Sequence, residues 1–129
     1  MCSSDLICNS APSEFLSSLA LRHRVSLLER NLGIIKDNLV LLDHFFEKYP
    51  QHFRWHRPVA GPIAFPALQE RQDIEKFCAA LVESKGVLLL PSTTYDYGNS
   101  HFRLGFGRKN MPECLEKLEE FIIEQEKKK

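Results

Sequence analysis

The chain has 129 residues, and its 17 basic and 17 acidic residues give a formal net charge of zero. This length fits one domain, and the apolar and charged fractions are those of an ordinary folded protein. Balanced charge gives no electrostatic support for nucleic-acid binding. No apolar run approaches the ~20 residues that span a bilayer. We therefore expect neither nucleic acid nor a membrane as a partner.

The cysteines and histidines do not suggest a metal site. The chain has four cysteines, at Cys2, Cys8, Cys78 and Cys114, with no C-x-x-C pair and no histidine at zinc-finger spacing. His44, His52 and His56 share no common ligand face, so we assign no metal ligands. Cys78 lies within an apolar segment and is expected in the core. This usage fits a reduced, cytoplasmic chain, and a Cys-His nucleophile stays a minor alternative.

A long helix is predicted from Pro12 to Lys48. Pro12 suits the first helical turn, with Ser10 as a cap, and Gly33 is the only glycine in the segment. Apolar residues recur at steps of four and three, at Leu21, Val25, Leu28, Leu32, Ile35, Leu39, Leu42 and Phe46. The pattern indicates one amphipathic helix, or two that join near Gly33.

The length of this segment raises a question about what covers it. At 1.5 Å per residue the helix would be roughly 55 Å long, whereas a compact domain of this size is roughly 35 to 40 Å across. We therefore expect the helix to bend, or one end of its stripe to pack against protein outside this chain. A coiled-coil dimer is the alternative explanation of the spacing.

Short strands and a helix follow. Residues Phe53–Arg57 alternate, the chain turns, and Pro62–Pro66 reads as an edge-type strand. Asp73 should cap a helix that ends at Lys85, before a glycine. Val87–Pro91 is wholly apolar, which predicts a strand that is central or buried on both faces.

The last third of the chain contains a polar loop, a strand and a helix. The loop spans Ser92–Ser100, the strand follows, and Asn110 should cap a final helix. Leu115, Leu118 and Ile122 should face inward from that helix. The order of helices and strands predicts an α+β fold, in which one small, antiparallel sheet is covered by helices and preceded by the long helix.

Arg103 is the principal candidate for a binding residue. Strand side chains alternate between faces, so Phe102, Leu104 and Phe106 form a core face, and Arg103 shares the open face with His101, Gly105 and Gly107. An arginine beside positions without side chains can bind a carboxylate or phosphate through two parallel hydrogen bonds. The alternative, from the strand pattern alone, is a solvated arginine. The loop before the strand brings Tyr95 next to Arg103.

Four motifs, taken together with their order along the chain, resemble the C-terminal small domain of class I/II aminotransferases. These are the fold-type I enzymes that use pyridoxal 5'-phosphate (PLP). The resemblance rests on Gly86–Pro91 and His101–Phe106 with the helix after them. Ala60–Pro66 is similar to the family's pair of strands after its interdomain helix, and Ile7–Glu14 is similar to the entry into that helix. The resemblance covers about 7–121, and it favours a carboxylate-binding role for Arg103 over a solvated one.

The resemblance implies roles for two residues and a cofactor. In the family, the arginine of this strand holds the substrate's α-carboxylate, which implies that role for Arg103. Tyr95 lies in a loop that resembles the rim of the active site, which implies a lining role. The cofactor implied is PLP, which acts as the electron sink in amino transfer. The family's Schiff-base lysine and other PLP-binding residues precede the segment that Ile7 resembles, so we assign no catalytic and no cofactor-binding residue. In particular, no lysine of this chain corresponds to the family's Schiff-base lysine in this resemblance. This holds for Lys36, Lys48, Lys76, Lys85 and Lys109.

The same resemblance implies the domain organisation. Residues 1–6 do not fit the family and are expected to be a non-native leader. Residues 7–48 would form the interdomain-type helix, and residues 49–129 the C-terminal small domain. The implied partners are an amino-acid substrate, a large domain outside this chain, and a second subunit of a homodimer. We expect the fragment alone to be inactive.

Two further interpretations stay open. The chain could be a stand-alone interaction module whose long helix pairs with another helix. It could also derive from a fold-type I PLP enzyme with another reaction, such as a decarboxylase, a lyase or a cyclase. The sequence does not separate these reactions, because the family selects them largely outside this segment.

Overall fold

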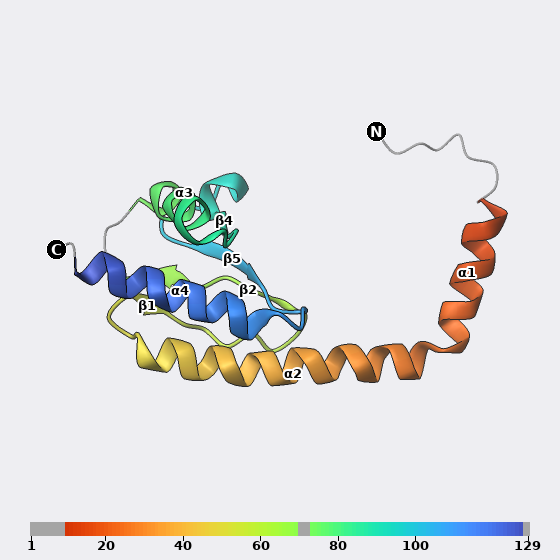
Figure 1. The fold of residues 1–129 in the computed structure, drawn as a ribbon. Helices are drawn as coiled ribbons and strands as arrows, with labels where there is room; N and C mark the ends of the chain where they lie inside the picture. The colour runs from red at the N-terminus through yellow and green to blue at the C-terminus, as the bar shows by residue number, and fades with distance from the viewer. Residues whose placement is uncertain (1–9, 70–72, 128–129) are drawn as a thin grey trace. The chain divides into compact units, whose positions relative to one another are not determined.

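The structure is a computed structural model that describes residues 10–69 and 73–127 (Figure 1). Two compact units are distinguished, Met1–Gly33 and Ile34–Lys129, and each is described by itself. The expected leader at 1–6 and the start of the family-like segment at 7–9 lie outside the described residues.

The first helical segment contains a break that differs from the prediction. Helix α1 spans Ala11–Arg22 and helix α2 spans Arg24–Lys48, so the interruption lies at His23, and Gly33 lies inside α2. At His23 the backbone has φ −98° and ψ 14°, and its N–H completes the last turn of α1 by donating to the carbonyl of Leu19. Neither His23 nor its neighbours break helices by propensity, so the residue types do not signal this break.

The apolar stripe changes its environment along α2. In the first unit, Leu28 is 57% exposed and Leu32 is 48% exposed. In the second unit, Leu42 is fully buried and Phe46 is 2% exposed. Within its own unit, the N-terminal part of the predicted stripe is therefore exposed, and within the second unit the C-terminal part is buried.

The core of the second unit begins with aromatic packing at the end of α2. Phe46 stacks on Trp55 with ring centroids 4.4 Å apart and meets Phe53 edge-on at 5.4 Å. Trp55 is half-buried, and its indole Nε1 donates to Asp43 Oδ1 at 2.8 Å. These contacts fix the first strand against α2.

The strands form two small antiparallel sheets. In one sheet β1 (Phe53–Arg54) pairs with β3 (Ala67–Leu68). In the other the order is β2 (Ile63–Ala64), β5 (Phe102–Gly105) and β4 (Leu90–Pro91). The first two strands are shorter than predicted, and β3 was not predicted. Its pairing with β1 and its bridge to His101 depend on partners distant in sequence.

The prediction that Val87–Pro91 is central or buried on both faces is wrong. Only Leu90–Pro91 forms a strand, and β4 lies at the edge, because β2 and β4 both pair with β5. Val87 and Leu89 are buried, whereas Leu88 between them is 73% exposed. In this apolar run, buried and exposed side chains therefore alternate, and the outer face is exposed in the described structure.

The two remaining helices agree with the sequence analysis in extent. Helix α3 spans Ile74–Lys85. Asp73 Oδ1 accepts from the backbone N–H of Glu75 at 3.0 Å, and the helix ends at Gly86 with φ 69°. Helix α4 spans Met111–Glu126 and buries Leu115, Leu118 and Ile122 as predicted. Asn110 lies at its N-cap position but makes no side-chain capping hydrogen bond there.

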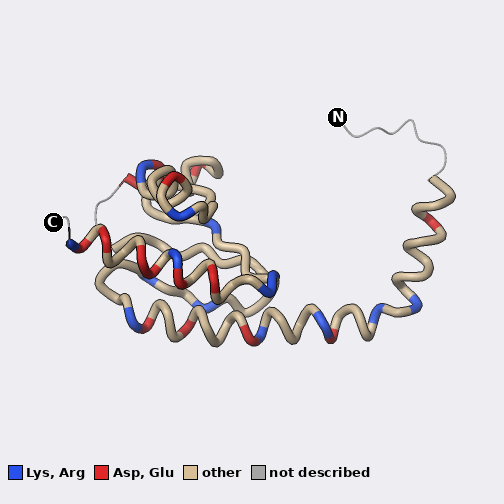
Figure 2. The backbone as a smooth tube through the Cα atoms, viewed as in Figure 1, with Lys and Arg blue, Asp and Glu red and all other residues tan. Residues whose placement is uncertain are grey.

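Charged side chains connect α4 to its neighbours. Acidic residues recur along α4 (Figure 2). Glu119 binds Lys48 of α2 and accepts a hydrogen bond from the Tyr49 hydroxyl at 2.5 Å. On α3, Lys85 pairs with Glu120 and Glu124 at 2.9 and 2.7 Å. Within the described ranges, no helix is long and apolar enough to cross a membrane.

Candidate functional site

Strand β5 has the two faces that the alternation predicts. Phe102 is fully buried and Leu104 is 4% exposed, whereas Arg103 and Gly105 are exposed. A Cβ atom at Gly105 would meet nothing within 4 Å, so the space beside Arg103 is open. Gly107 differs, because a Cβ there would lie 3.2 Å from Pro62 Cβ. Gly107 therefore permits close backbone packing rather than access for a ligand.

A buried amide holds the end of this strand against α2. Asn38 is 4% exposed, and its Nδ2 donates to the carbonyl oxygens of Phe106 at 2.8 Å and Arg108 at 2.7 Å. Both amide protons are therefore used on backbone acceptors that follow β5. The strand that carries Arg103 has a fixed position relative to the C-terminal part of α2.

The loop before β5 is ordered by its own hydrogen bonds. It opens with a 3-10 helix, η1 (Ser92–Tyr95), and turns at Asp96 with φ 52°. The buried Ser92 hydroxyl donates to the Gly98 carbonyl at 2.9 Å and accepts from the His101 N–H at 3.2 Å. Asn99 Oδ1 accepts from the N–H of Ile74 at 3.1 Å. The loop thus has a defined shape beside Arg103.

The structure brings together the two residues that the sequence analysis selected. Arg103 Nη1 lies 3.5 Å from the hydroxyl oxygen of Tyr95, which is the outer limit of a hydrogen bond. Arg103 forms no ion pair with any residue that the structure describes. Its guanidinium therefore keeps most of its donors for another group.

Four rings gather beside Arg103, and we call Phe65, Tyr95, Tyr97 and His101 the aromatic cluster. Phe65 stacks on His101 with centroids 5.2 Å apart and an interplanar angle of 15°. Tyr97 meets His101 at 5.1 Å and Phe65 at 5.5 Å, both edge-on. Alternation placed His101 on the face of Arg103. No sequence pattern indicated Phe65, which reaches the cluster through the pairing of β2 with β5.

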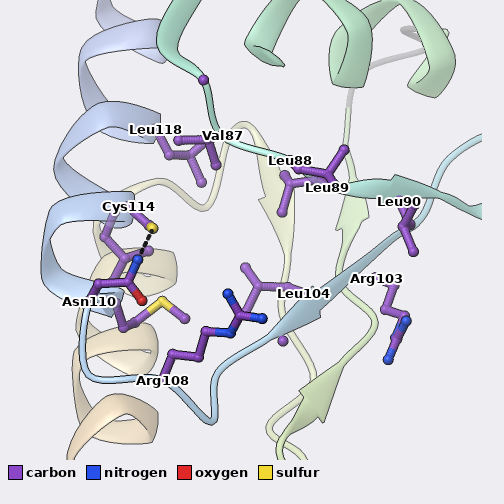
Figure 3. Close-up of a pocket in the computed structure, with 14 residues that line it drawn as sticks. Val87, Leu88, Leu89, Leu90, Arg103, Leu104, Arg108, Asn110, Cys114 and Leu118 are labelled. Carbon is purple, nitrogen blue, oxygen red and sulfur yellow. Dashed lines mark hydrogen bonds between the residues drawn. The ribbon is translucent and has the colours of Figure 1, made fainter.

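A hollow of about 390 Å³ lies between β5, the segment before β4 and α4 (Figure 3). Its lining is mostly apolar and comprises Gly86, Val87, Leu88, Leu89, Leu90, Arg103, Leu104, Gly105, Arg108, Asn110, Met111, Cys114, Leu115 and Leu118. Figure 3 shows the guanidinium groups of Arg103 and Arg108 well apart, with that of Arg103 directed away from the hollow. The two arginines do not form one clamp.

Three of the described lysines do not suit the attachment of PLP. Hydrogen bonds to glutamate side chains raise the pKa of Lys48, Lys85 and Lys117. A lysine that condenses with an aldehyde must first lose its proton, which a raised pKa opposes. No group of three potential metal ligands gathers in the described parts of the chain. The buried Cys78 also does not suit a nucleophile, because burial raises the pKa of its thiol to about 11.

Comparison with known proteins points to one fold. A PLP-dependent aminotransferase from Streptococcus suis superposes with a TM-score of 0.84 at 31% identity, over 92% of this chain and 32% of that chain. The PLP-dependent cyclase OrfR gives a TM-score of 0.83 at 27% identity, over 91% of this chain and 33% of that one. An aspartate aminotransferase from Thermotoga maritima, at 23% identity and a TM-score of 0.62, shares the fold over 73% of this chain and 24% of its own.

No protein-family model and no curated protein sequence matches the chain. The fold is nevertheless that of fold-type I, PLP-dependent aminotransferase-like proteins. Within that class, the chain matches a C-terminal portion, as its motifs predicted, and it spans about a third of the length of the solved structures with the two highest TM-scores above.

Proposed function

We propose that this chain is the C-terminal part of a PLP-dependent aminotransferase that acts on an amino acid, and that Arg103 binds the substrate's carboxylate. The observation that carries the proposal is an exposed arginine without an ionic partner among the described residues, on a strand whose other face is core. Similarity to aminotransferases over most of the chain supports the reaction class.

The role of Arg103 follows from its surroundings. The open space at Gly105 lets a ligand approach the sheet beside the guanidinium. Asn38 and the ordered loop fix the backbone on both sides of the strand, so the arginine binds from a defined position. A carboxylate held by two charge-assisted hydrogen bonds is oriented as well as bound, which aligns the rest of the amino acid for reaction. Tyr95 would line the same site.

PLP would be held by residues outside those described here. We propose a large domain that supplies them, and a homodimer as the full-length assembly. The exposed apolar residues of α1 and the start of α2 support a protein partner, because the apolar stripe of an amphipathic helix ordinarily packs against other protein. The residues of this chain then contribute substrate binding and orientation. The fragment alone would have no transaminase activity.

The test is a kinetic comparison in the complete polypeptide that carries this segment. Arg103→Ala should lower kcat/KM for amino acids by about 10- to 100-fold, because charge-assisted hydrogen bonds contribute about 1.5 to 3 kcal/mol. Arg108→Ala is the matched control, since it removes a guanidinium that points elsewhere. Equal kinetics for wild type and Arg103→Ala would rule out the proposed role.

A second reaction class is supported by one specific observation. The cyclase OrfR matches almost as well as the first aminotransferase, with a TM-score of 0.83 over 91% of this chain. A cyclase would use the same carboxylate site, because the proposed role of Arg103 does not depend on the bond that is later formed. Product analysis of the complete polypeptide with an amino acid and an oxo-acid acceptor separates the two reactions.

A further inference from the structure

We propose that the aromatic cluster of Phe65, Tyr95, Tyr97 and His101 forms the subsite for the substrate's side chain, and that this side chain is an uncharged aromatic ring. The inference rests on the proposed function, because it takes the carboxylate at Arg103 as the anchor. It adds a substrate class, which the fold does not determine.

The register of the sheet places the cluster directly beside Arg103. Ala64 pairs with Leu104, and the N–H of Phe102 donates to the Pro66 carbonyl at 3.0 Å, so Phe65 lies opposite Arg103. Residues that are directly opposite in antiparallel strands present side chains on the same face. His101 lies two residues before Arg103, on that same face. The rings of the aromatic cluster are therefore the nearest neighbours of a ligand that is bound to the Arg103 guanidinium.

The rings have uncovered area and a fixed arrangement. Tyr97 is 58% exposed and Tyr95 is 46% exposed, although both belong to a loop whose backbone is held by the buried Ser92. Phe65 contacts both tyrosine rings edge-on, and its centroid is 6.2 Å from that of Tyr95. Preformed exposed tyrosines offer large contact area at low entropic cost, and ring pairs gain from edge-on or offset contacts.

The positive charges around the cluster disfavour a cationic side chain. Arg54 pairs with Ala67, which bridges to His101, so a positive charge lies two strands from the cluster on the same face. Burial, and then the charges of Arg54 and His56, lower the pKa of His101, which keeps its ring neutral. Asp96 is the only acidic residue of the loop from 92 to 100. The ring faces carry partial negative charge and disfavour an anion, and the positive charges disfavour a cation. Together they favour a neutral aromatic group.

The nearby hollow offers a competing place for an apolar side chain. It is lined by Leu88, Leu89 and Leu115 and begins beside Arg103. The Arg103 guanidinium, however, is directed away from it and lies within 3.5 Å of Tyr95. A carboxylate bound to that guanidinium is therefore closer to the aromatic cluster than to the leucines.

The experiment compares two carboxylate probes on the complete polypeptide by calorimetric titration, 3-phenylpropanoate and butanoate. Wild type should bind the phenyl compound more tightly. Tyr97→Ala should reduce the ratio of the two affinities by about two- to tenfold, in line with ring-pair energies. Tyr97→Phe should keep the ratio, because it keeps the ring. Leu88→Ala, exposed in the hollow, should leave the ratio as in wild type.

The outcomes separate this inference from the proposed function. If Arg103→Ala weakens both probes but Tyr97→Ala leaves the ratio unchanged, the carboxylate site stands and the aromatic subsite is wrong. If Leu88→Ala lowers the ratio instead, the side chain occupies the hollow and the inference is again overturned. If Arg103→Ala changes neither affinity, both proposals fail.

Discussion

Asn38 and Phe106 are joined by a buried hydrogen bond of 2.8 Å between a side-chain amide and a backbone carbonyl. The second amide proton of Asn38 binds the carbonyl of Arg108 at 2.7 Å. One polar side chain in an apolar stripe thus satisfies two carbonyls that no strand partner reaches. The helix and the end of β5 are connected through this residue.

Asn38→Leu should lower the free energy of unfolding by about 2 to 5 kcal/mol, because a buried and a part-buried carbonyl lose their donors. Asp37→Asn, at the neighbouring exposed position, is the matched control and should stay within about 0.5 kcal/mol of wild type. Urea denaturation followed by circular dichroism measures both. A loss below 1 kcal/mol for Asn38→Leu would show that water replaces the amide.

Gly86 should tolerate alanine poorly even though space is available. Its φ is 69°, and an added Cβ would meet nothing within 4 Å, so the cost comes from the backbone alone. We expect Gly86→Ala to destabilise by about 1 kcal/mol. Gly105→Ala is the control, since its Cβ also has open space and its φ is not positive. Equal melting temperatures for the two variants would contradict the view that the left-handed backbone at Gly86 causes the cost.

Glu119 should make stability depend on pH in the acid range. The hydrogen bonds from Lys48, and then from Tyr49, lower the pKa of Glu119. A lowered carboxyl pKa stabilises the folded state above the unfolded value of about 4.3, and this contribution is lost as the pH falls through the lower folded pKa. The stability difference between wild type and Glu119→Gln should therefore shrink from pH 6 to pH 3.

Glu47→Gln provides the control for this pH series. Glu47 is exposed on α2 and forms no ion pair with a residue that the structure describes. The difference in unfolding free energy between Glu47→Gln and wild type, measured by chemical denaturation, should stay nearly constant from pH 6 to pH 3. A constant difference for Glu119→Gln as well would show that its carboxylate is not coupled to folding.

Elements with local signals were predictable from the sequence. Asp73 and Gly86 determined the ends of α3 because a cap and a left-handed residue act through their own neighbours. The alternation around Arg103 gave the correct faces of β5, since the period of a strand is local. The pairing of Arg103 with Tyr95 followed from their closeness in the chain.

Features that depend on distant partners were not predictable. Strand β3 exists because Phe53 and His101 bring partners to it. The apolar neighbours of Leu88 predicted a central position, but Leu88 precedes the edge strand β4 and is exposed. Phe65 joins the aromatic cluster only after β2 pairs with β5. In each case the relevant neighbour is more than ten residues away in the chain.

The oligomeric state of the chain tests the alternative of an interaction module. If the exposed stripe at Leu28 is the seam of a helical dimer, Leu28→Glu should convert a discrete dimer to a monomer in sedimentation. We expect instead no discrete dimer in the wild-type chain, and less non-specific association for Leu28→Glu. Glu29→Ala, on an exposed neighbouring position, serves as the control.

The most direct test of the account is the binding of an amino acid to the complete polypeptide, measured by calorimetry for wild type, Arg103→Ala and Arg108→Ala. We predict that Arg103→Ala weakens binding by about 10- to 100-fold through the loss of charge-assisted hydrogen bonds, while Arg108→Ala binds like wild type. Wild-type affinity in Arg103→Ala would contradict the central claim that Arg103 binds the carboxylate.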